Sequence, residues 1–231
     1  SLPTLWRRPP ADVRRGANLT QMVAISYHTL DAYGFHALEM VQCLAERRAG
    51  GETGVRQVRC LSGNRVWEAL ANGTIDEGLL QAAVVPLESS PVKRGDQSLM
   101  EMAKEPTAMI VDYRDGFRAS ILTLNGAVNE WSVAWHEDGK SKATMFWTQE
   151  ARPFMHFTYL VKGTEQMFHT GKPSWPAERT LYTSAILDAA LISLKRGGKA
   201  VPTPYLNIPY QSDWNWQQPP PPPLGRPVHD K

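Results

Sequence analysis

The sequence has no long apolar run and no strong excess of charge of either sign. A membrane-spanning helix needs about 20 consecutive apolar residues, and no run approaches that length. Lys and Arg number 25 against 23 Asp and Glu, a net charge of +2. No global field therefore attracts nucleic acid or an anionic membrane surface. We expect the 231-residue chain to bind neither nucleic acid nor membrane.

Cysteine is scarce, with Cys43 and Cys60 as the two examples. Cys43 lies in a helical pattern and Cys60 in a strand-like one, so buried free thiols are expected. A disulfide between them stays an open alternative. The sequence begins at Ser1 without an initiator Met or a signal peptide. We therefore expect a processed product or a fragment, and a cytoplasmic location.

Composition divides the chain into three parts. Residues 1–16 hold three prolines and four arginines and are expected to be an extended segment. Residues 17–210 carry the regular patterns of a folded α/β domain. Residues 211–231 form a Pro-rich tail whose five consecutive prolines, 219–223, predict stiff polyproline II structure. An arm-like or disordered terminus is expected there, with binding to a partner as the alternative.

Hydrophobic periodicity predicts the secondary structure of the middle part. Strands are expected at 19–27 and 55–61, and two hairpins at 107–147 have turns at 114–116 and 138–139. Helices are expected from about Gly34 to residue 48, over 64–73 and 74–85, and over 153–171 and 177–198. Residues 86–106 have no clear period and are expected to form a long loop, and 201–210 is at best an edge strand.

This order predicts an α+β fold: a mostly antiparallel open sheet with helices packed on one face. The other face then needs cover. Three tryptophans alternate with polar residues along the expected strands, namely Trp131, Trp135 and Trp147. They predict a homo-oligomer that forms through the open sheet face, although an aromatic face could also bind sugar rings.

Two helices near the end of the domain have predicted faces. His156, Lys162 and His169 are expected on the surface of the first. In the second, small and apolar residues are expected to pack on the sheet as one stripe, which consists of Leu181, Ser184, Ala185, Asp188, Ala189 and Ile192.

Most of the polar chemistry lies in one stretch of seventeen residues, YHTLDAYGFHALEMVQC (27–43). It holds His28, Asp31, Tyr33, His36 and Glu39 at a strand-to-helix junction. His36 could act as a general acid or base because the unperturbed pKa of histidine is about 6.5. Alternatively, it caps the first helical turn. Glu39 lies one turn further on, where it could hold the tautomer of His36 or simply favour the helix N-terminus.

This order of motifs resembles the C-terminal domain of the glucose-fructose oxidoreductase, inositol dehydrogenase and rhizopine-catabolism (Gfo/Idh/MocA) family. In that family a glycine, a histidine two residues later and an acid three residues after that open a helix, and here they are Gly34, His36 and Glu39. The alanine-rich closing helix and the strand after it resemble residues 185–201. The likeness covers roughly residues 17–206.

The resemblance implies the fold of a glyceraldehyde-3-phosphate dehydrogenase-like C-terminal domain and several residue roles. His36 and Asp31 would be catalytic, and Tyr33, Glu39 and His28 would bind a small hydroxylated substrate. The family usually places an aspartate four residues before the histidine, where this sequence has Ala32. The chain would be the substrate-binding and oligomerisation half of an NAD(P)-dependent oxidoreductase acting on a sugar, polyol or related hydroxy compound.

The cofactor half of such an enzyme is missing from the sequence. No strand is followed by the G-x-G-x-x-G turn of a Rossmann domain, and GGETG (50–54) comes before a strand instead. Lys104-Glu105-Pro106 has the letters of the family's E-K-P motif in the wrong order. We therefore expect that this chain alone binds no cofactor and is no dehydrogenase by itself. NAD(P) would be used only if an N-terminal Rossmann domain is present.

Two alternative functions follow from the same residues. The chain could be a non-catalytic binding or scaffold module that has kept the fold. It could also be a metal-dependent hydrolase or lyase that uses His28, Asp31, His36 and Glu39, which are residue types that bind divalent metals. No H-x-H or C-x-x-C cluster supports this second alternative, so no metal ligand is assigned.

Overall fold

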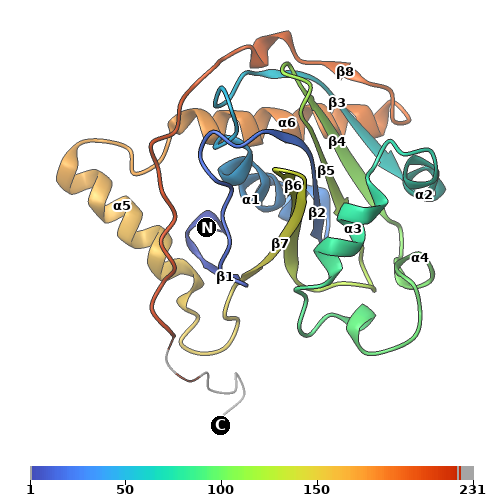
Figure 1. The fold of residues 1–231 in the computed structure, drawn as a ribbon, viewed down its shortest axis with the longest axis horizontal. Helices are drawn as coiled ribbons and strands as arrows, with labels where there is room; N and C mark the ends of the chain where they lie inside the picture. Colours follow the sequence, from blue (N-terminus) through green and yellow to red (C-terminus); the bar gives the residue numbers. More distant parts are fainter. Residues whose placement is uncertain (1, 223, 225–231) are drawn as a thin grey trace.

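In the computed structural model, which describes residues 2–222 and 224, eight strands form one sheet (Figure 1). Their order across the sheet is β1-β7-β6-β2-β5-β4-β3-β8. The strands are β1 (Trp6–Arg8), β2 (Leu19–Ser26), β3 (Val55–Ser62), β4 (Thr107–Tyr113), β5 (Arg118–Thr123), β6 (Trp131–Glu137), β7 (Lys140–Trp147) and β8 (Val201–Pro202). Neighbouring strands are antiparallel except β2 and β5, which are parallel. The predicted mostly antiparallel sheet is confirmed.

Both predicted hairpins form, but they are not neighbours in the sheet. β4 pairs with β5 and β6 pairs with β7, and β2 is inserted between the two hairpins. The second hairpin turns at Asp138 and Gly139, which have φ angles of 51° and 75°, the left-handed conformation that a tight two-residue hairpin turn requires. The insertion makes β2 a central strand, so the polar stretch that follows it starts from the middle of the sheet.

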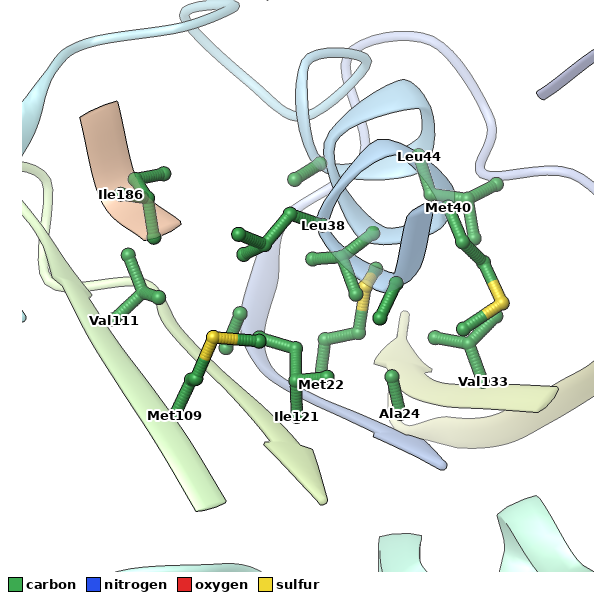
Figure 2. Packing of buried hydrophobic residues seen from close by; sticks show 14 of the residues in the cluster. Met22, Ala24, Leu38, Met40, Leu44, Met109, Val111, Ile121, Val133 and Ile186 are labelled. Carbon is green, nitrogen blue, oxygen red and sulfur yellow. The ribbon is translucent and has the colours of Figure 1, made fainter. Parts of the chain in front are cut away.

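Six helices accompany the described strands: α1 (Phe35–Ala45), α2 (Asn64–Ala71), α3 (Glu77–Val84), α4 (Leu99–Met102), α5 (Thr158–Thr170) and α6 (Ala177–Lys195). α1 and α6 pack on one face of the sheet, where Met22 and Ala24 of β2 meet Leu38 of α1 (Figure 2). This face holds the larger apolar core, which also contains Ile186 of α6. Burial of such side chains contributes roughly 1.5–3 kcal/mol each.

The second face of the sheet also carries helices, so the expectation that helices pack on one face is too narrow. Val23 and Ile25 of β2 point to this face and are buried with Leu79 of α3 and Val66 of α2. Because successive residues of β2 alternate between two buried faces, its sequence MVAI (22–25) is apolar throughout rather than alternating. The chain itself therefore covers much of the face that was expected to be open.

The tryptophans that suggested an open face lie in the core on the α1 side. Trp131 and Trp135 are buried, and Trp135 donates a hydrogen bond from Nε1 to Glu137 Oε2 at 3.1 Å. Trp147 packs against the same core. They are therefore not exposed on a sheet surface of this chain. Homo-oligomerisation itself stays a prediction.

Helix α6 packs with a different stripe from the predicted one. Leu181 is 48% exposed, whereas the buried residues are Arg179, Tyr182, Thr183, Ile186, Ala189, Ala190 and Ser193. The prediction assumed that only small and apolar residues face the core. Polar side chains of α6 also face it, because they form hydrogen bonds there. Ser193, for example, accepts a hydrogen bond from Cys60 N at 2.9 Å and donates one to Lys199 O at 2.7 Å.

Two segments, helix α5 and the Pro-rich tail, lie at the side of the molecule (Figure 1). Helix α5 stands away from the body (Figure 1) and has no buried residue; its Phe168, and Phe157 just before it, are exposed. The Pro-rich tail is not a free arm over its described part. Residues 211–222 run back along the N-terminal segment 2–15 (Figure 1) and bond to it at several points. Pro223 and residues 225–231 lie outside the described residues.

The two cysteines and the lengths of the helices bear on two further expectations. Cys43 and Cys60 are both free and fully buried, as predicted. None of the helices in the described part of the chain combines the length and the apolar character needed to cross a bilayer.

Candidate active site

The candidate site starts where β2 ends and the chain turns toward α1. His28 has a φ of 70°, an unusual conformation for a residue other than glycine. The side chain of Asn125 holds this turn: it accepts a hydrogen bond from His28 N at 2.6 Å and donates one to His28 O at 3.0 Å. Leu30–Gly34 then forms a π-helical turn before α1 begins. Such turns often occur at functional sites, and this one sets the directions of the side chains that follow.

Aromatic rings surround His36 in a small cavity of about 230 Å³. Tyr27, Tyr33 and Trp131 form a cluster, with ring centroids 5.1–5.2 Å apart. The His36 ring lies 6.1 Å from that of Tyr33 and 6.4 Å from that of Trp131. This volume is below the roughly 300 Å³ at which ligand pockets usually begin, so a ligand of this cavity would have to be small.

One ring nitrogen of His36, a residue that lines this cavity, has no partner among the described residues. Its Nδ1 is buried and has no hydrogen-bond partner in the described structure. Burial lowers the pKa of His36 because it disfavours the charged imidazolium. The imidazole is therefore neutral near pH 7 and can accept a proton. This is the state that a general base needs.

A carboxylate, Glu150, lies at the same cavity. Thr148 Oγ1 donates a hydrogen bond to Glu150 Oε1 at 3.0 Å, and the Tyr27 hydroxyl donates to the same oxygen at 3.5 Å. Burial, reinforced by the charge of Glu150, raises the pKa of Tyr27, so its phenol remains a donor. The cavity therefore offers a hydrogen-bond acceptor, a phenol donor and a neutral imidazole between flat aromatic walls.

His156 lines this cavity too, although the sequence placed it on a helix surface. It belongs to the 3₁₀ turn Met155–Phe157 just before α5, and its Nδ1 is buried without a partner. His169 is exposed near the end of α5, as expected. The difference arises because the turn before α5 folds back toward Tyr33 and His36, whereas α5 itself points outward.

Asp31 and His28 line a different cavity from His36. This second cavity, of about 620 Å³, lies by the ends of β2 and β5 and is also lined by Thr107 and Asn125. Asp31 is exposed, and a hydrogen bond from Thr29 lowers its pKa. His28 of this cavity stacks on Tyr33 of the His36 cavity, with ring centroids 4.6 Å apart. The structure does not bring Asp31 and His36 together.

Glu39 lies inside the α1–α6 contact rather than in either cavity. It is 8% exposed, and its Oε1 has no hydrogen-bond partner in the described structure. Burial raises the pKa of Glu39, while the charge of Arg179 acts in the opposite direction. Across the described residues no hydrogen bond joins Glu39 to His36. The contact by which Glu39 would hold the histidine tautomer is therefore not made.

The metal-site hypothesis is not supported by this arrangement. Nowhere in the described part of the chain do three or more His, Cys, Asp or Glu side chains form a group that could hold a metal ion. His28 and Asp31 lie in one cavity, His36 lies in another, and Glu39 lies between helices. The metal-dependent hydrolase or lyase is therefore not retained.

The described residues also do not fit a dinucleotide cofactor. Such a cofactor is held by a glycine-rich turn between a strand and a helix N-terminus. The junction between β3 and α2 has Gly63 alone, and the junction between β2 and α1 has Gly34 at its far end. No step that uses a bound dinucleotide is derived for these residues.

Comparison with known proteins gives structural matches alone. No protein-family model matches the sequence, and neither does any curated protein. GenD2 from gentamicin A biosynthesis, solved in complex with NAD, aligns with 80% of this chain and 55% of its own, with a TM-score of 0.47 and 11% identity. A probable dehydrogenase from Thermotoga maritima aligns over 83% and 57%, with a TM-score of 0.47 and 13% identity.

A myo-inositol dehydrogenase from Corynebacterium glutamicum aligns over 80% of this chain and 56% of its own, with a TM-score of 0.47 and 11% identity. Two of these three proteins are named as dehydrogenases, and the third was solved with NAD. This chain spans about half the length of each of them. At this level of similarity no residue role is carried over to this chain.

Proposed function

We propose that this chain is the substrate-binding half of a Gfo/Idh/MocA-like oxidoreductase that acts on a sugar, polyol or related hydroxy compound. The observation that carries the proposal is the unpartnered, buried Nδ1 of His36 in an aromatic cavity of about 230 Å³. The motif Gly34-x-His36-x-x-Glu39, which resembles that of the family, supports it. Oligomerisation belongs to the same proposal.

His36 has the state required for the proton step of alcohol oxidation. When hydride leaves the carbon of a secondary alcohol, the hydroxyl proton must be removed so that a carbonyl forms. A neutral imidazole accepts this proton and becomes imidazolium. The lowered pKa of His36 supports this role because it keeps the ring unprotonated before the reaction. The hydride acceptor would be an NAD(P) held by a Rossmann domain outside the described residues.

The walls of the cavity suit a ring-shaped hydroxylated molecule. The rings of Tyr33 and Trp131 line the cavity and can contact the C–H groups of a sugar or cyclic polyol. Glu150 can accept hydrogen bonds from hydroxyl groups, and the Tyr27 phenol can donate one. Together these groups would orient one hydroxyl toward His36.

A second function, a non-catalytic binding module of the same fold, is favoured by one observation. Asp31, which the resemblance pairs with His36, is exposed and lines the other cavity. His36 therefore lacks the carboxylate neighbour that would orient it as a base. A binding module would need the cavity but not this pair.

Turnover of the natural full-length protein tests the first function against the second. A panel of cyclic polyols and aldoses is supplied with NAD⁺ or NADP⁺, and reduced cofactor is followed by its absorbance. His36→Ala should abolish turnover, whereas His169→Ala, an exposed control on α5, should leave it unchanged. Both variants should melt near the wild-type temperature. Turnover retained by His36→Ala would refute the role of His36, and polyol binding without turnover in wild type would favour the binding module.

A further inference from the structure

Trp6 of β1 binds the proline-rich tail of its own chain through its indole N–H. Trp6 Nε1 donates a hydrogen bond to the carbonyl oxygen of Pro220 at 2.9 Å. Trp6 is only 3% exposed, and the neighbouring Pro219 is also buried. The rings of Trp147 and Tyr159 pack edge-on against Trp6, with centroids 5.4 and 5.3 Å away. These three rings are called the Trp6 surface below.

This contact has the chemistry of polyproline II recognition. Consecutive prolines have no N–H groups, so their carbonyl oxygens are the polar atoms that a binding surface can reach. A surface for such a segment needs aromatic rings for the pyrrolidine rings and a donor for a carbonyl. The Trp6 surface supplies both, because the indole combines a large apolar face with one N–H.

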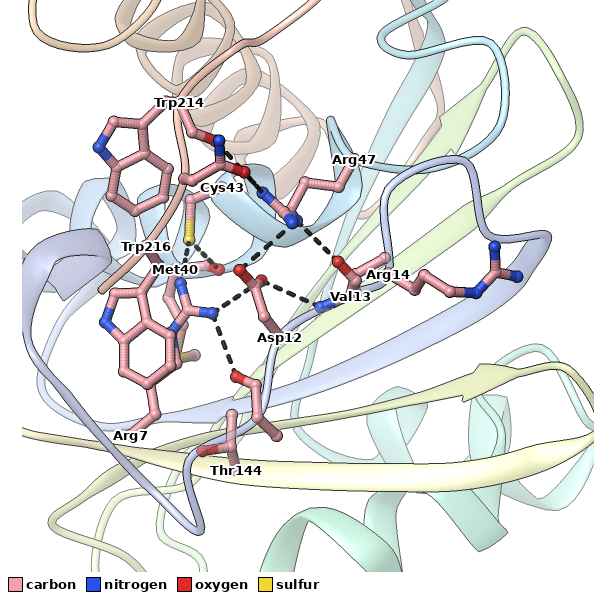
Figure 3. Close-up of polar contacts among 12 residues, drawn as sticks. Arg7, Asp12, Val13, Arg14, Met40, Cys43, Arg47, Thr144, Trp214 and Trp216 are labelled. Atoms are coloured by element: carbon pink, nitrogen blue, oxygen red, sulfur yellow. Dashed lines mark hydrogen bonds and ion pairs between the residues drawn. The ribbon is translucent and has the colours of Figure 1, made fainter. Parts of the chain in front are cut away.

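A separate set of contacts anchors the part of the tail that precedes the prolines. Arg15 and Arg47 both donate to the carbonyl of Trp214, at 3.1 and 3.2 Å. Trp216 donates from Nε1 to Leu5 O at 2.8 Å, and its ring lies 4.3 Å from the guanidinium of the buried Arg7 (Figure 3). None of these contacts involves the prolines, so they would hold residues 214–216 in place also when the Trp6 surface is empty.

We propose that the Trp6 surface is a binding site for polyproline II segments, with residues 219–222 as its built-in ligand. The short connection from the anchored residues gives these prolines a high effective concentration at the site. A proline-rich segment supplied from outside must displace them. The site therefore takes such a partner weakly while the tail is in place and more tightly when the tail is released.

The test uses the full-length chain in which Pro219→Ser, Pro220→Ser, Pro221→Ser and Pro222→Ser are combined. The probe is the octapeptide QQPPPPPL, which is the sequence of residues 217–224, and the control is the same peptide with its five prolines changed to alanine. Binding is followed by tryptophan fluorescence. The proline peptide should bind the variant at least tenfold more tightly than wild type, and the alanine peptide should not bind detectably.

Adding Trp6→Phe to the same variant keeps an aromatic ring but removes the N–H donor. One lost hydrogen bond should weaken peptide binding about fivefold. Equal binding of the two peptides, no binding of the proline peptide to the variant, or no effect of Trp6→Phe would overturn the proposal.

Hydrogen exchange at the Trp6 indole, measured by NMR, tests whether residues 219–222 occupy the Trp6 surface in the wild-type chain. The indole proton should exchange slowly in wild type and faster in the serine variant. Fast exchange in wild type would contradict occupation of the site by residues 219–222, independently of any peptide.

Discussion

Arg179 of α6 and Glu46, which caps the C-terminus of α1, form a bidentate ion pair inside the core. Arg179 Nη2 lies 2.6 Å from Glu46 Oε1 and Nε lies 3.0 Å from Oε2, with both side chains at most 1% exposed. The Tyr210 hydroxyl donates a further bond to Glu46 at 2.9 Å. This pair joins α6 to the C-terminal end of α1, the helix whose first turn carries His36.

Removing one partner of this pair should destabilise the protein strongly. Arg179→Met leaves the Glu46 carboxylate buried without its counter-charge, which costs about 3–5 kcal/mol. The double variant Arg179→Met, Glu46→Leu should recover most of that loss. Urea unfolding measures both. Arg14→Ala, which breaks an exposed pair with Asp138, is the control and should cost less than about 1 kcal/mol. If Arg179→Met lowers the free energy of unfolding by no more than Arg14→Ala does, the ion pair is not buried in solution.

The lowered pKa of His36 predicts a pH dependence of stability. The unfolded chain binds the histidine proton near pH 6.5, whereas the folded chain binds it at a lower pH. This contribution is therefore fully present above pH 6.5 and is lost as the pH falls toward the folded pKa. Urea unfolding between pH 8 and 5 should show a steeper decline for wild type than for His36→Phe. Parallel curves would mean that His36 titrates normally.

Both thiols should be unreactive in the native protein. Burial raises the pKa of Cys43 and of Cys60 to about 12, and the thiolate is the reactive form. At pH 8 a thiol reagent should modify almost no cysteine in the folded chain and both cysteines in the urea-unfolded chain. The assay is repeated after reduction as a control. If the urea-unfolded chain shows no reactive thiol before reduction and two after it, a disulfide joins Cys43 and Cys60.

Exposed phenylalanines on α5 should matter little for the stability of the single chain. Phe168 is 78% exposed, so Phe168→Ser should change the free energy of unfolding by less than about 0.5 kcal/mol. The matched control Phe146→Ala, at a buried position of β7, should cost about 3–5 kcal/mol. If Phe168→Ser destabilises the protein or lowers its mass in light scattering, α5 is covered in solution by another chain.

The elements could be predicted from sequence because their signals are local. The helix that opens at Phe35 and both hairpins follow from periodicity and turn residues alone. The place of β2 between β5 and β6 could not be predicted, because it depends on pairing between residues about a hundred positions apart. The apolar run of residues 22–25 was the available signal that helices cover both faces.

The sequence predicted only the part of the candidate site that lies in one continuous stretch. His36 and Tyr33 were found because they lie close together in sequence at one junction. Trp131 and Glu150 reach the same cavity from β6 and from the segment after β7, and no local pattern connects them to His36. Asp31 lies in the π-helical turn Leu30–Gly34, which the helical periodicity did not predict, and it lines a different cavity from His36.

The first described residue of the chain, Leu2, is buried and forms part of the wall of the His36 cavity. Any chain attached at the amino end, natural or added, would therefore start beside the candidate site. Measurements of His36 are for this reason best made on the natural full-length protein.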